Sequence, residues 1–345
     1  MEQRPILGIT MGDPVSIGPE ISVKALADPK IYRECRPLII GDAKVMEKAV
    51  GILGLEESVQ IHPVKEVEEA VFLPGTIDVY DMEIVNMERL VYGKVSRMGG
   101  EASFQYVKKV IELALDHKVD ATVTNALNKE AINLAGHHYS GHTEIYAELT
   151  ETDKYTMLLA HHNMRVVHVS THVSLREACD RVKKARVMDV IHIADEACRS
   201  LGIEHPRIAV AGLNPHSGEN GLFGKEEIEE IIPAVDAAVR EGLDVTGPVP
   251  PDTVFSKARG GMFDIVVAMY HDQGHIPLKL VGFVYDDVQK EWNAVEGVNV
   301  TLGLPIIRTS VDHGTAFEHA GLGDANELSL VNAIEYAVTL VKNKK

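Results

Sequence analysis

Cysteine is scarce in this chain, and its distribution gives no sign of a disulfide framework. The three cysteines, Cys35, Cys179 and Cys198, include no C-x-x-C pair. An odd number also cannot pair completely. Such usage fits a reducing compartment.

Long apolar runs are also missing. None approaches the roughly 18 residues of a membrane helix. The first residues, MEQRPILGITMGDP, contain too short an apolar stretch for a signal peptide. Acidic residues outnumber basic ones by 51 to 34, which gives a net charge of −17. Such a chain has no electrostatic reason to bind nucleic acid or anionic lipid. We therefore expect a soluble cytoplasmic protein with neither partner.

Two familiar nucleotide-binding loops are absent from the sequence. The glycine-containing loop near the N-terminus, Gly8–Glu20, has neither the Gly-Lys-Ser/Thr of a P-loop nor the G-x-G-x-x-G of a Rossmann turn. On its own, this loop predicts a tight connection from a strand to a helix.

The composition is otherwise that of a globular protein. The 345 residues are 45% hydrophobic and 25% charged, enough for one large domain or two ordinary ones. Short β-branched runs alternate with amphipathic helical stretches, which predicts an α/β fold with a mostly parallel sheet. The predicted strands are Ile6–Thr10, Pro37–Ile40, Ala121–Thr124, Arg165–Ser170, Arg207–Leu213, Asp264–Tyr270 and Ile306–Ser310. The predicted helices are Glu20–Ala27, Gly100–His117, Leu175–Leu201 and Lys225–Glu241. The Pro- and Gly-rich segment Gly242–Asp252 is expected to be a loop.

Histidine is abundant, with sixteen residues. Three of them, His172, His216 and His271, follow closely on predicted strands. The carboxyl ends of parallel strands share one edge of a sheet, so these imidazoles would converge. Three imidazoles with an open position suit a catalytic divalent metal. A single loop histidine is more often a surface hydrogen-bonding group, so the prediction depends on all three. Their flanks, Asn214–Gly221 and Tyr270–His275, have the polar and glycine-rich composition of ligand-binding loops.

Other segments could bind an anion. Ser140–Glu144 precedes a helical stretch that Ser140 or Thr143 could cap, and free amides at a helix start attract phosphate. A plain capping turn is the alternative. Lys279 and Arg308 could pair with carboxylate or phosphate, or could be solvated surface charges.

Seven stretches together resemble one known family. They run in order between residues 6 and 321, nearly the whole chain, and several are long and unlike common loop sequences. They are GITMGDPVSIGPE, SGHTEIYAEL, VSTHVSL, GLNPHSGENGLFGKEE, PPDTVF, MYHDQGHIPLK and GVNVTLGLPIIRTSVDHGTAFEHAG. The family is that of the 4-hydroxythreonine-4-phosphate dehydrogenases of vitamin B6 biosynthesis.

The resemblance implies an isocitrate/isopropylmalate dehydrogenase-like fold. This fold has two α/β/α domains with the active site in the cleft between them. The family forms a homodimer that shares the site across its interface. We expect a discontinuous first domain, residues 1–125 plus 305–345. Residues 126–304 would form a second domain that carries the metal-binding histidines.

The resemblance also implies roles for single residues. The metal ligands would be the same three histidines, His172, His216 and His271. The expected substrate contacts are His142, Thr143, Lys279, Asn299 and Arg308. The expected cofactor loop comprises Asp312, His313, Gly314 and Thr315, although its composition alone would also suit a satisfied turn. Candidates for the general acid and base are Lys129 and Asp252.

One departure from the family concerns the substrate. Between Lys279 and Asn299 the chain is longer than the pyridoxine-pathway enzymes, and the insert includes Tyr285–Asp287 and Trp292. Such an insert resembles the sister group that oxidises D-threonate or D-erythronate 4-phosphate.

The expected reaction is therefore oxidation of D-threonate or D-erythronate 4-phosphate, with decarboxylation, to dihydroxyacetone phosphate and CO2. The cofactor would be NAD, with NADP as the alternative. One divalent ion (zinc, cobalt, nickel, iron, manganese or magnesium) would assist as a Lewis acid. One alternative is a 4-hydroxy-L-threonine 4-phosphate dehydrogenase. A more distant alternative is a metal-dependent hydrolase or lyase without nicotinamide.

Overall fold

The computed structural model describes residues 4–286, 291–295 and 297–344. The chain forms two compact units. Unit 1 comprises Met1–Thr152, Ala294–Val298 and Leu304–Lys342; unit 2 comprises Asp153–Asn293, Asn299–Gly303 and Asn343–Lys345. The domain boundaries expected from the sequence, between residues 125 and 126 and between 304 and 305, stay a prediction. Residues 126–152 belong to unit 1.

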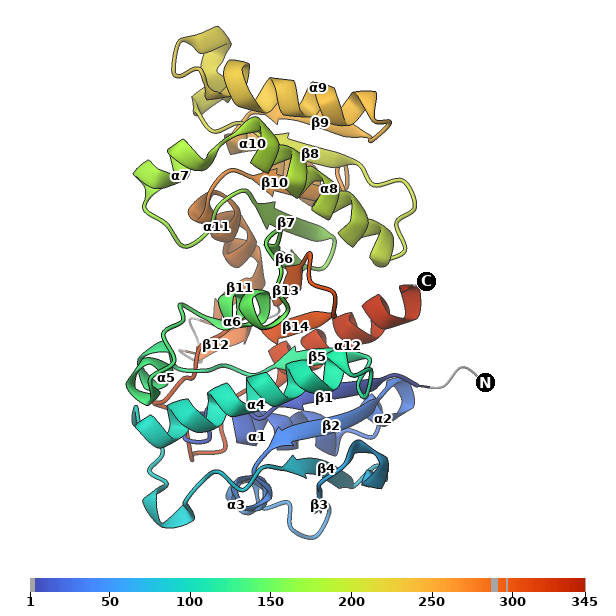
Figure 1. The fold of residues 1–345 in the computed structure, drawn as a ribbon, viewed down its shortest axis with the longest axis vertical. Helices are drawn as coiled ribbons and strands as arrows, with labels where there is room; N and C mark the ends of the chain where they lie inside the picture. The colour runs from blue at the N-terminus through green and yellow to red at the C-terminus, as the bar shows by residue number, and fades with distance from the viewer. Residues whose placement is uncertain (1–3, 287–290, 296, 345) are drawn as a thin grey trace. The chain divides into compact units, whose positions relative to one another are not determined.

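Unit 1 is built on a sheet with the strand order β3-β4-β2-β1-β5-β14 (Figure 1). Its strands are β1 (Ile6–Thr10), β2 (Arg36–Gly41), β3 (Gln60–Val64), β4 (Thr76–Asp81), β5 (Ala121–Thr124) and β14 (Arg308–Val311). All neighbouring strands in this order are parallel, which confirms the predicted α/β class. The strands β1 and β5 have the predicted bounds.

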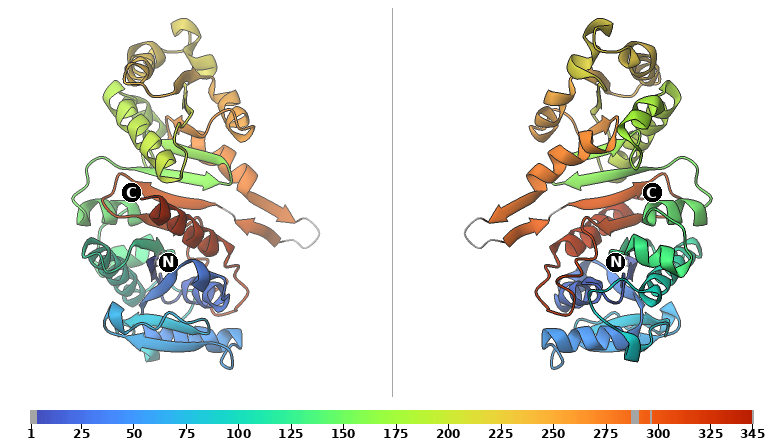
Figure 2. Two further views of the ribbon diagram at one scale, coloured as in Figure 1. Left: turned by 90° about the vertical axis from the view of Figure 1, so that its right-hand side faces the viewer. Right: turned by 90° about the vertical axis from the view of Figure 1, so that its left-hand side faces the viewer.

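Helices pack against the sheet of unit 1 (Figure 2). They are α1 (Gly18–Ala27), α2 (Ile31–Glu34), α3 (Ala43–Leu53), α4 (Arg97–Leu115), α5 (Lys129–Ala135), α6 (His142–Leu149) and α12 (Leu328–Asn343). The chain runs from β1 towards one end of the sheet through β2, β3 and β4, and then returns past β1 to β5. Because crossovers between parallel strands are right-handed, the two directions place their connecting helices on opposite faces of the sheet. The helices α1 and α3 therefore lie on the opposite face from α4.

Unit 2 contains a second run of strands, in the order β13-β6-β7-β10-β8-β9. They are β6 (Thr156–His161), β7 (Met164–His168), β8 (Ile208–Ala211), β9 (Val245–Val249), β10 (Ile265–Ala268) and β13 (Val298–Leu302). The strands β7, β10, β8 and β9 are parallel, and β6 pairs with β7 in the antiparallel direction. The three histidine-bearing strand ends belong to the adjacent strands β7, β10 and β8.

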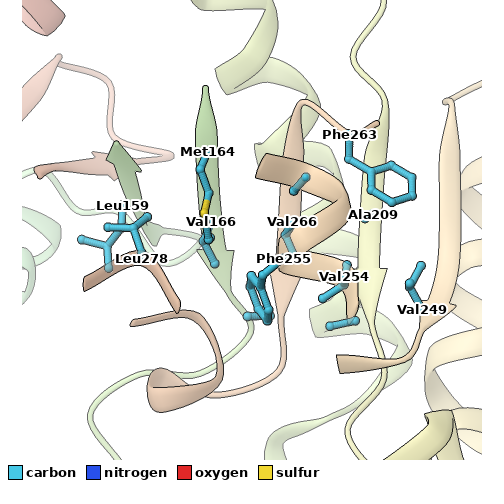
Figure 3. Close-up of a cluster of buried hydrophobic side chains, with 13 residues drawn as sticks. Leu159, Met164, Val166, Ala209, Val249, Val254, Phe255, Phe263, Val266 and Leu278 are labelled. Atoms are coloured by element: carbon cyan, nitrogen blue, oxygen red, sulfur yellow. The ribbon is translucent and has the colours of Figure 1, made fainter. Parts of the chain in front are cut away.

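The core of unit 2 lies between these strands and the helices α10 (Pro251–Arg259) and α11 (His271–Gly282). Figure 3 shows strand residues such as Val166 and Val266 packed with Val254 and Phe255 of α10 and Leu278 of α11. The other helices of the unit are α7 (Leu175–Arg181), α8 (Lys184–Ser200) and α9 (Ile232–Arg240).

The single helix predicted for Leu175–Leu201 is wrong, because the chain is extended between α7 and α8. This break buries Val182 completely. It also lets the amide of Lys184 donate to Glu230 Oε2 at 2.7 Å. Tertiary burial and a capping carboxylate therefore outweigh the continuous helical pattern.

Two further predictions need correction. The helix predicted for Lys225–Glu241 begins as a π-helix, Glu227–Ile231, and continues as α9. The segment Gly242–Asp252, expected to be a loop, contains the strand β9. This strand contains Pro248, which has no amide hydrogen to donate. Because β9 is at the edge of the sheet, only one of its sides is paired, and proline is tolerated there.

A separate two-stranded sheet follows α11 and consists of β11 (Phe283–Asp286) and β12 (Glu291–Val295) (Figure 2). The predicted insert falls here. Asp287 and the side chains of Tyr285, Asp286 and Trp292 lie outside what the structure describes. In the described part of the chain, no helix combines the length and apolar character that crossing a membrane requires.

Candidate functional site

The strand ends that carry the histidines of unit 2 are tied to one another by side chains. Ser170, after β7, donates its hydroxyl to the carbonyl of Met269, after β10, at 3.1 Å. The amide of Met269 donates to Gln273 Oε1 at 2.6 Å, and Gln273 Nε2 donates to the carbonyl of Gly212, after β8, at 2.8 Å. The three carboxyl ends therefore meet at one edge of the sheet, as predicted.

Two of the three predicted metal ligands lie together. The ring centroids of His172 and His271 are 5.9 Å apart, and both side chains line a cavity of about 440 Å³. The cavity wall is partly apolar, with Leu175 and Ala178 from α7. A small polar ligand beside the imidazoles would be partly shielded from water.

The orientation of His271 suits metal binding. Its Nδ1 lies 2.7 Å from Asp272 Oδ1, so a proton on Nδ1 would leave Nε2 as an electron-pair donor. Its ring also stacks on His275, with centroids 3.6 Å apart. The carboxylate would orient one imidazole, and the second imidazole, 5.9 Å away, would supply another nitrogen donor of the kind that divalent transition metals bind.

His216 is on a turn after β8, where its φ angle is +52°, and is not among the residues that line this cavity. Its ring neighbour is Phe223, with centroids 6.3 Å apart. Across residues 4–286, 291–295 and 297–344, no three His, Cys, Asp or Glu side chains form a group that could hold a metal ion. The metal role of His172, His216 and His271 stays a prediction.

Two buried histidines beside the pair were not identified from the sequence. His168 is fully buried, and burial, followed by the charge of His275, lowers its pKa to about 3. Burial, followed by the charge of His271, lowers the pKa of His275 to about 4. Both are therefore neutral near pH 7 and would not repel a cation. His168 lies in the apolar run of β7, and His275 ends the segment Tyr270–His275 that the sequence analysis singled out, so these positions were the available signals.

Unit 1 gathers basic side chains around Arg308, the first residue of β14. Arg308 is only 2% exposed, and its Nη2 donates to Thr124 Oγ1 at 2.8 Å. The guanidinium carbon lies 5.4 Å from the ring centroid of Tyr146. Burial lowers the pKa of Arg308 to about 10, so it remains a cation at neutral pH. The alternative of a solvated surface charge is wrong for this residue.

The start of α6 lies beside this arginine. Its N-cap is Gly141 and no side chain caps it, so capping by Ser140 or Thr143 is wrong. His142 Nε2 is buried and has no hydrogen-bond partner among the described residues. Burial, then the charges of Arg308 and Lys129, hold the pKa of His142 well below its usual value. A neutral imidazole, two cations and the Glu144 carboxylate, whose charge acts to raise the pKa of Arg308, therefore gather here, with Thr143 in the first turn.

The predicted cofactor loop follows β14 in unit 1. The carbonyl of Thr315 accepts a hydrogen bond from the amide of Ile17 at 3.3 Å. The buried Glu20 accepts hydrogen bonds from the amides of Gly321 and Gly323 at 2.7 and 2.6 Å. The N-terminal glycine loop thus holds the late loop in place, a link that spacing alone did not reveal.

A model of one protein family, described as the pyridoxal phosphate biosynthetic protein PdxA, matches residues 33–337. The chain belongs to the PdxA family. A D-threonate 4-phosphate dehydrogenase from Cupriavidus necator is 46% identical over 341 residues, covering 99% of this chain and 98% of that protein.

Solved PdxA structures have the same fold. A 4-hydroxythreonine-4-phosphate dehydrogenase from Klebsiella pneumoniae has a TM-score of 0.84 at 44% identity, covering 98% of this chain and 99% of that one. A 4-hydroxythreonine-4-phosphate dehydrogenase from Burkholderia phymatum has a TM-score of 0.83 at 46% identity, with the same coverage. The predicted isocitrate dehydrogenase-like fold and the predicted class, a dehydrogenase, are confirmed.

Membership of the PdxA family also bears on cofactors. These dehydrogenases suggest NAD and a divalent metal in general, with a small phosphorylated substrate. The relatives named above are dehydrogenases, which favours that class over the alternative of a hydrolase or lyase.

The remaining predicted residues of this PdxA protein lie in unit 2, and their roles stay predictions. Asn299 in β13 donates its Nδ2 to Met157 Sδ at 2.7 Å. Lys279 in α11 is half-buried, and its charge helps to lower the pKa of His275. Asp252 is exposed in the first turn of α10.

Proposed function

We propose that this protein is an NAD-dependent, divalent-metal-dependent dehydrogenase that converts D-threonate 4-phosphate to dihydroxyacetone phosphate and CO2. The observation that carries the proposal is the full-length similarity to an enzyme of that name. The paired imidazoles of unit 2 and the cations of unit 1 supply the expected chemistry.

His172 and His271, with His216, would hold the metal ion. When bound, the ion would supply Lewis acidity to the hydroxyl that is oxidised and to the carboxylate that is lost as CO2. Asp272 keeps the His271 ring in one orientation through the 2.7 Å contact with Nδ1. NAD, held by Asp312, His313, Gly314 and Thr315, would accept the hydride.

The phosphate group would bind between Arg308 and His142. The guanidinium of Arg308 is desolvated, which strengthens its attraction to an anion. The uncapped amides at the start of α6 add hydrogen-bond donors near Thr143. Lys279 and Asn299 complete the proposed substrate contacts. Lys129 and Asp252 are the proposed acid and base, since each carries a titratable group beside a helix start.

D-erythronate 4-phosphate and 4-hydroxy-L-threonine 4-phosphate are the alternative substrates. The solved relatives named 4-hydroxythreonine-4-phosphate dehydrogenase favour the latter. The insert before Asn299 favours the sugar-acid phosphates. NADP is the alternative cofactor.

A substrate screen tests the proposal. The purified protein is mixed with each of the three phosphorylated acids and with NAD or NADP, and formation of the reduced cofactor is followed by absorbance. We expect the highest kcat/KM with D-threonate 4-phosphate and NAD. Chelation should abolish turnover and one of the divalent metals should restore it. His271→Ala should be inactive, whereas His205→Ala, an exposed histidine of the same unit, should behave as wild type.

Faster turnover of 4-hydroxy-L-threonine 4-phosphate would contradict the proposed substrate. Turnover that survives chelation would contradict the proposed metal requirement.

We further propose a homodimer that shares the site across its interface.

A further inference from the structure

His216 is presented by an unusual backbone. Five consecutive residues, from 216 to 220, have φ angles between +42° and +80°, and four of them are not glycine. A left-handed turn of this length costs conformational free energy for L-residues. It therefore persists only if the surrounding structure holds it.

Glu227 supplies that hold. Its side chain is buried, with 1% exposed. Its Oε1 accepts hydrogen bonds from the amides of Leu213 and Asn214 at 2.8 and 2.7 Å, and its Oε2 accepts from Asn214 Nδ2 at 2.9 Å. One carboxylate thus binds three donors at the entrance to the turn.

The turn itself packs against this carboxylate. A Cβ atom built on Gly218 would lie 2.6 Å from Glu227 Oε2, so the middle of the turn approaches the carboxylate too closely for any side chain. Glu227 is also the first residue of the π-helix, a distortion that is frequent at functional sites. A second hydrogen bond holds the loop before the turn. Gln273, two residues after His271, donates its Nε2 to the carbonyl of Gly212.

We propose that Glu227 is the positioning residue for His216, and that its carboxylate holds the left-handed turn from which this imidazole would reach the metal ion. The inference rests on the proposed function, in which His216 is a metal ligand. Glu227 acts through the backbone of Leu213 and Asn214 rather than by touching the ion.

A Co²⁺ titration tests this role without substrate or turnover. The apoprotein is titrated with Co²⁺ alone, and the visible absorption of the bound ion gives the Kd. Glu227→Ala should raise the Kd by about 10- to 100-fold, as for other residues that orient metal ligands. Glu229→Ala removes an exposed carboxylate of the same π-helix and should leave the Kd unchanged.

Glu227→Gln distinguishes positioning from general stability. Glutamine keeps an Oε1 acceptor for the two backbone amides but turns its own NH2 group towards Asn214 Nδ2. The Kd should therefore fall between those of the wild type and Glu227→Ala. A wild-type Kd for Glu227→Ala would overturn the proposal. If that variant does not fold, Glu227→Gln is compared with Glu229→Gln, and equal Kd values would overturn it.

His216→Ala in the same titration separates this inference from the function it rests on. If His216→Ala binds Co²⁺ as the wild type does, the metal role of His216 is wrong and the proposal fails with it. If His216→Ala binds weakly while Glu227→Ala binds normally, only the role of Glu227 is wrong.

Discussion

Asp13 is completely buried in the loop after β1, and its Oδ1 accepts a hydrogen bond from the amide of Val15 at 3.1 Å. Its Oδ2 has no hydrogen-bond partner among the described residues. Burial disfavours the carboxylate and raises the pKa of Asp13 from 3.8 to about 6. The stabilisation from its protonated form is fully present below pH 3.8 and is lost as the pH rises through about 6.

Asp13→Asn should therefore change the pH dependence of stability. Asparagine cannot ionise, so the variant should gain stability relative to wild type between about pH 4 and pH 7, by up to about 3 kcal/mol. Urea unfolding of both proteins across this range measures the difference. Asp116→Asn, at an exposed position, should show no such trend. A difference for Asp13→Asn that is constant with pH would contradict the prediction.

Arg308 gives a second prediction at the level of one side chain. Arg308→Ala should raise the Michaelis constant for the phosphorylated substrate by about 10- to 100-fold, because a charge-assisted contact is lost. The Michaelis constant for NAD should change much less. Arg308→Lys keeps the charge but loses the planar fork, and should be intermediate. Equal effects on both Michaelis constants would show that Arg308 does not bind the phosphate group.

Among the secondary-structure elements, α10 carries Asp252 in its first turn and packs against the core of unit 2. Val254, Phe255 and Ala258 bury one face of this helix against the strands (Figure 3). The other face is polar or exposed, so the helix depends on packing rather than on its own propensity.

Phe255→Ala should destabilise the protein by about 3–5 kcal/mol, because it removes a buried ring and leaves a cavity. Thermal or urea unfolding measures the loss. Met262→Ala, just after the helix, removes a side chain that is 55% exposed and should change stability by less than about 0.5 kcal/mol. A similar loss in both variants would show that the ring does not anchor the core.

For the whole molecule, the proposed shared site can be tested by mixing subunits. His172 and His271 line one cavity, whereas His216 stands on a separate turn. If the third ligand came from the partner subunit, His216→Ala and His271→Ala would complement each other. Half of the randomly reassembled dimers would each contain one intact site, giving about a quarter of wild-type turnover.

Sedimentation of the mixture should confirm dimers of equal size to the wild type. Each variant alone should remain inactive. A mixture with no recovered turnover, despite proven exchange of subunits, would mean that His216 and His271 serve the same site within one chain.

Much of the architecture could be predicted because it depends on local signals. The strands β1 and β5 are short segments rich in Ile, Val and Thr, and their bounds follow from that composition. The common edge for His172, His216 and His271 followed from the rule that parallel strands share their carboxyl ends.

The contacts that shape the site could not be predicted in this way. The Glu230 carboxylate that caps α8 lies 46 residues from Lys184, and the Glu20 carboxylate lies 301 residues from Gly321. The two partners of each bond lie far apart in the sequence, and no local spacing links them. Their pairing depends on which elements pack together.

Composition and local spacing alone determined the α/β class and the alternation of strands with helices, because side-chain periodicity is a property of short segments. They also determined which imidazoles and cations were candidates for the site. The tertiary structure alone decided the break at Val182, the left-handed turn that carries His216 and the neutral state of His168. Each of these results from burial or from a distant hydrogen-bond partner, whose free energy outweighs the local backbone preference.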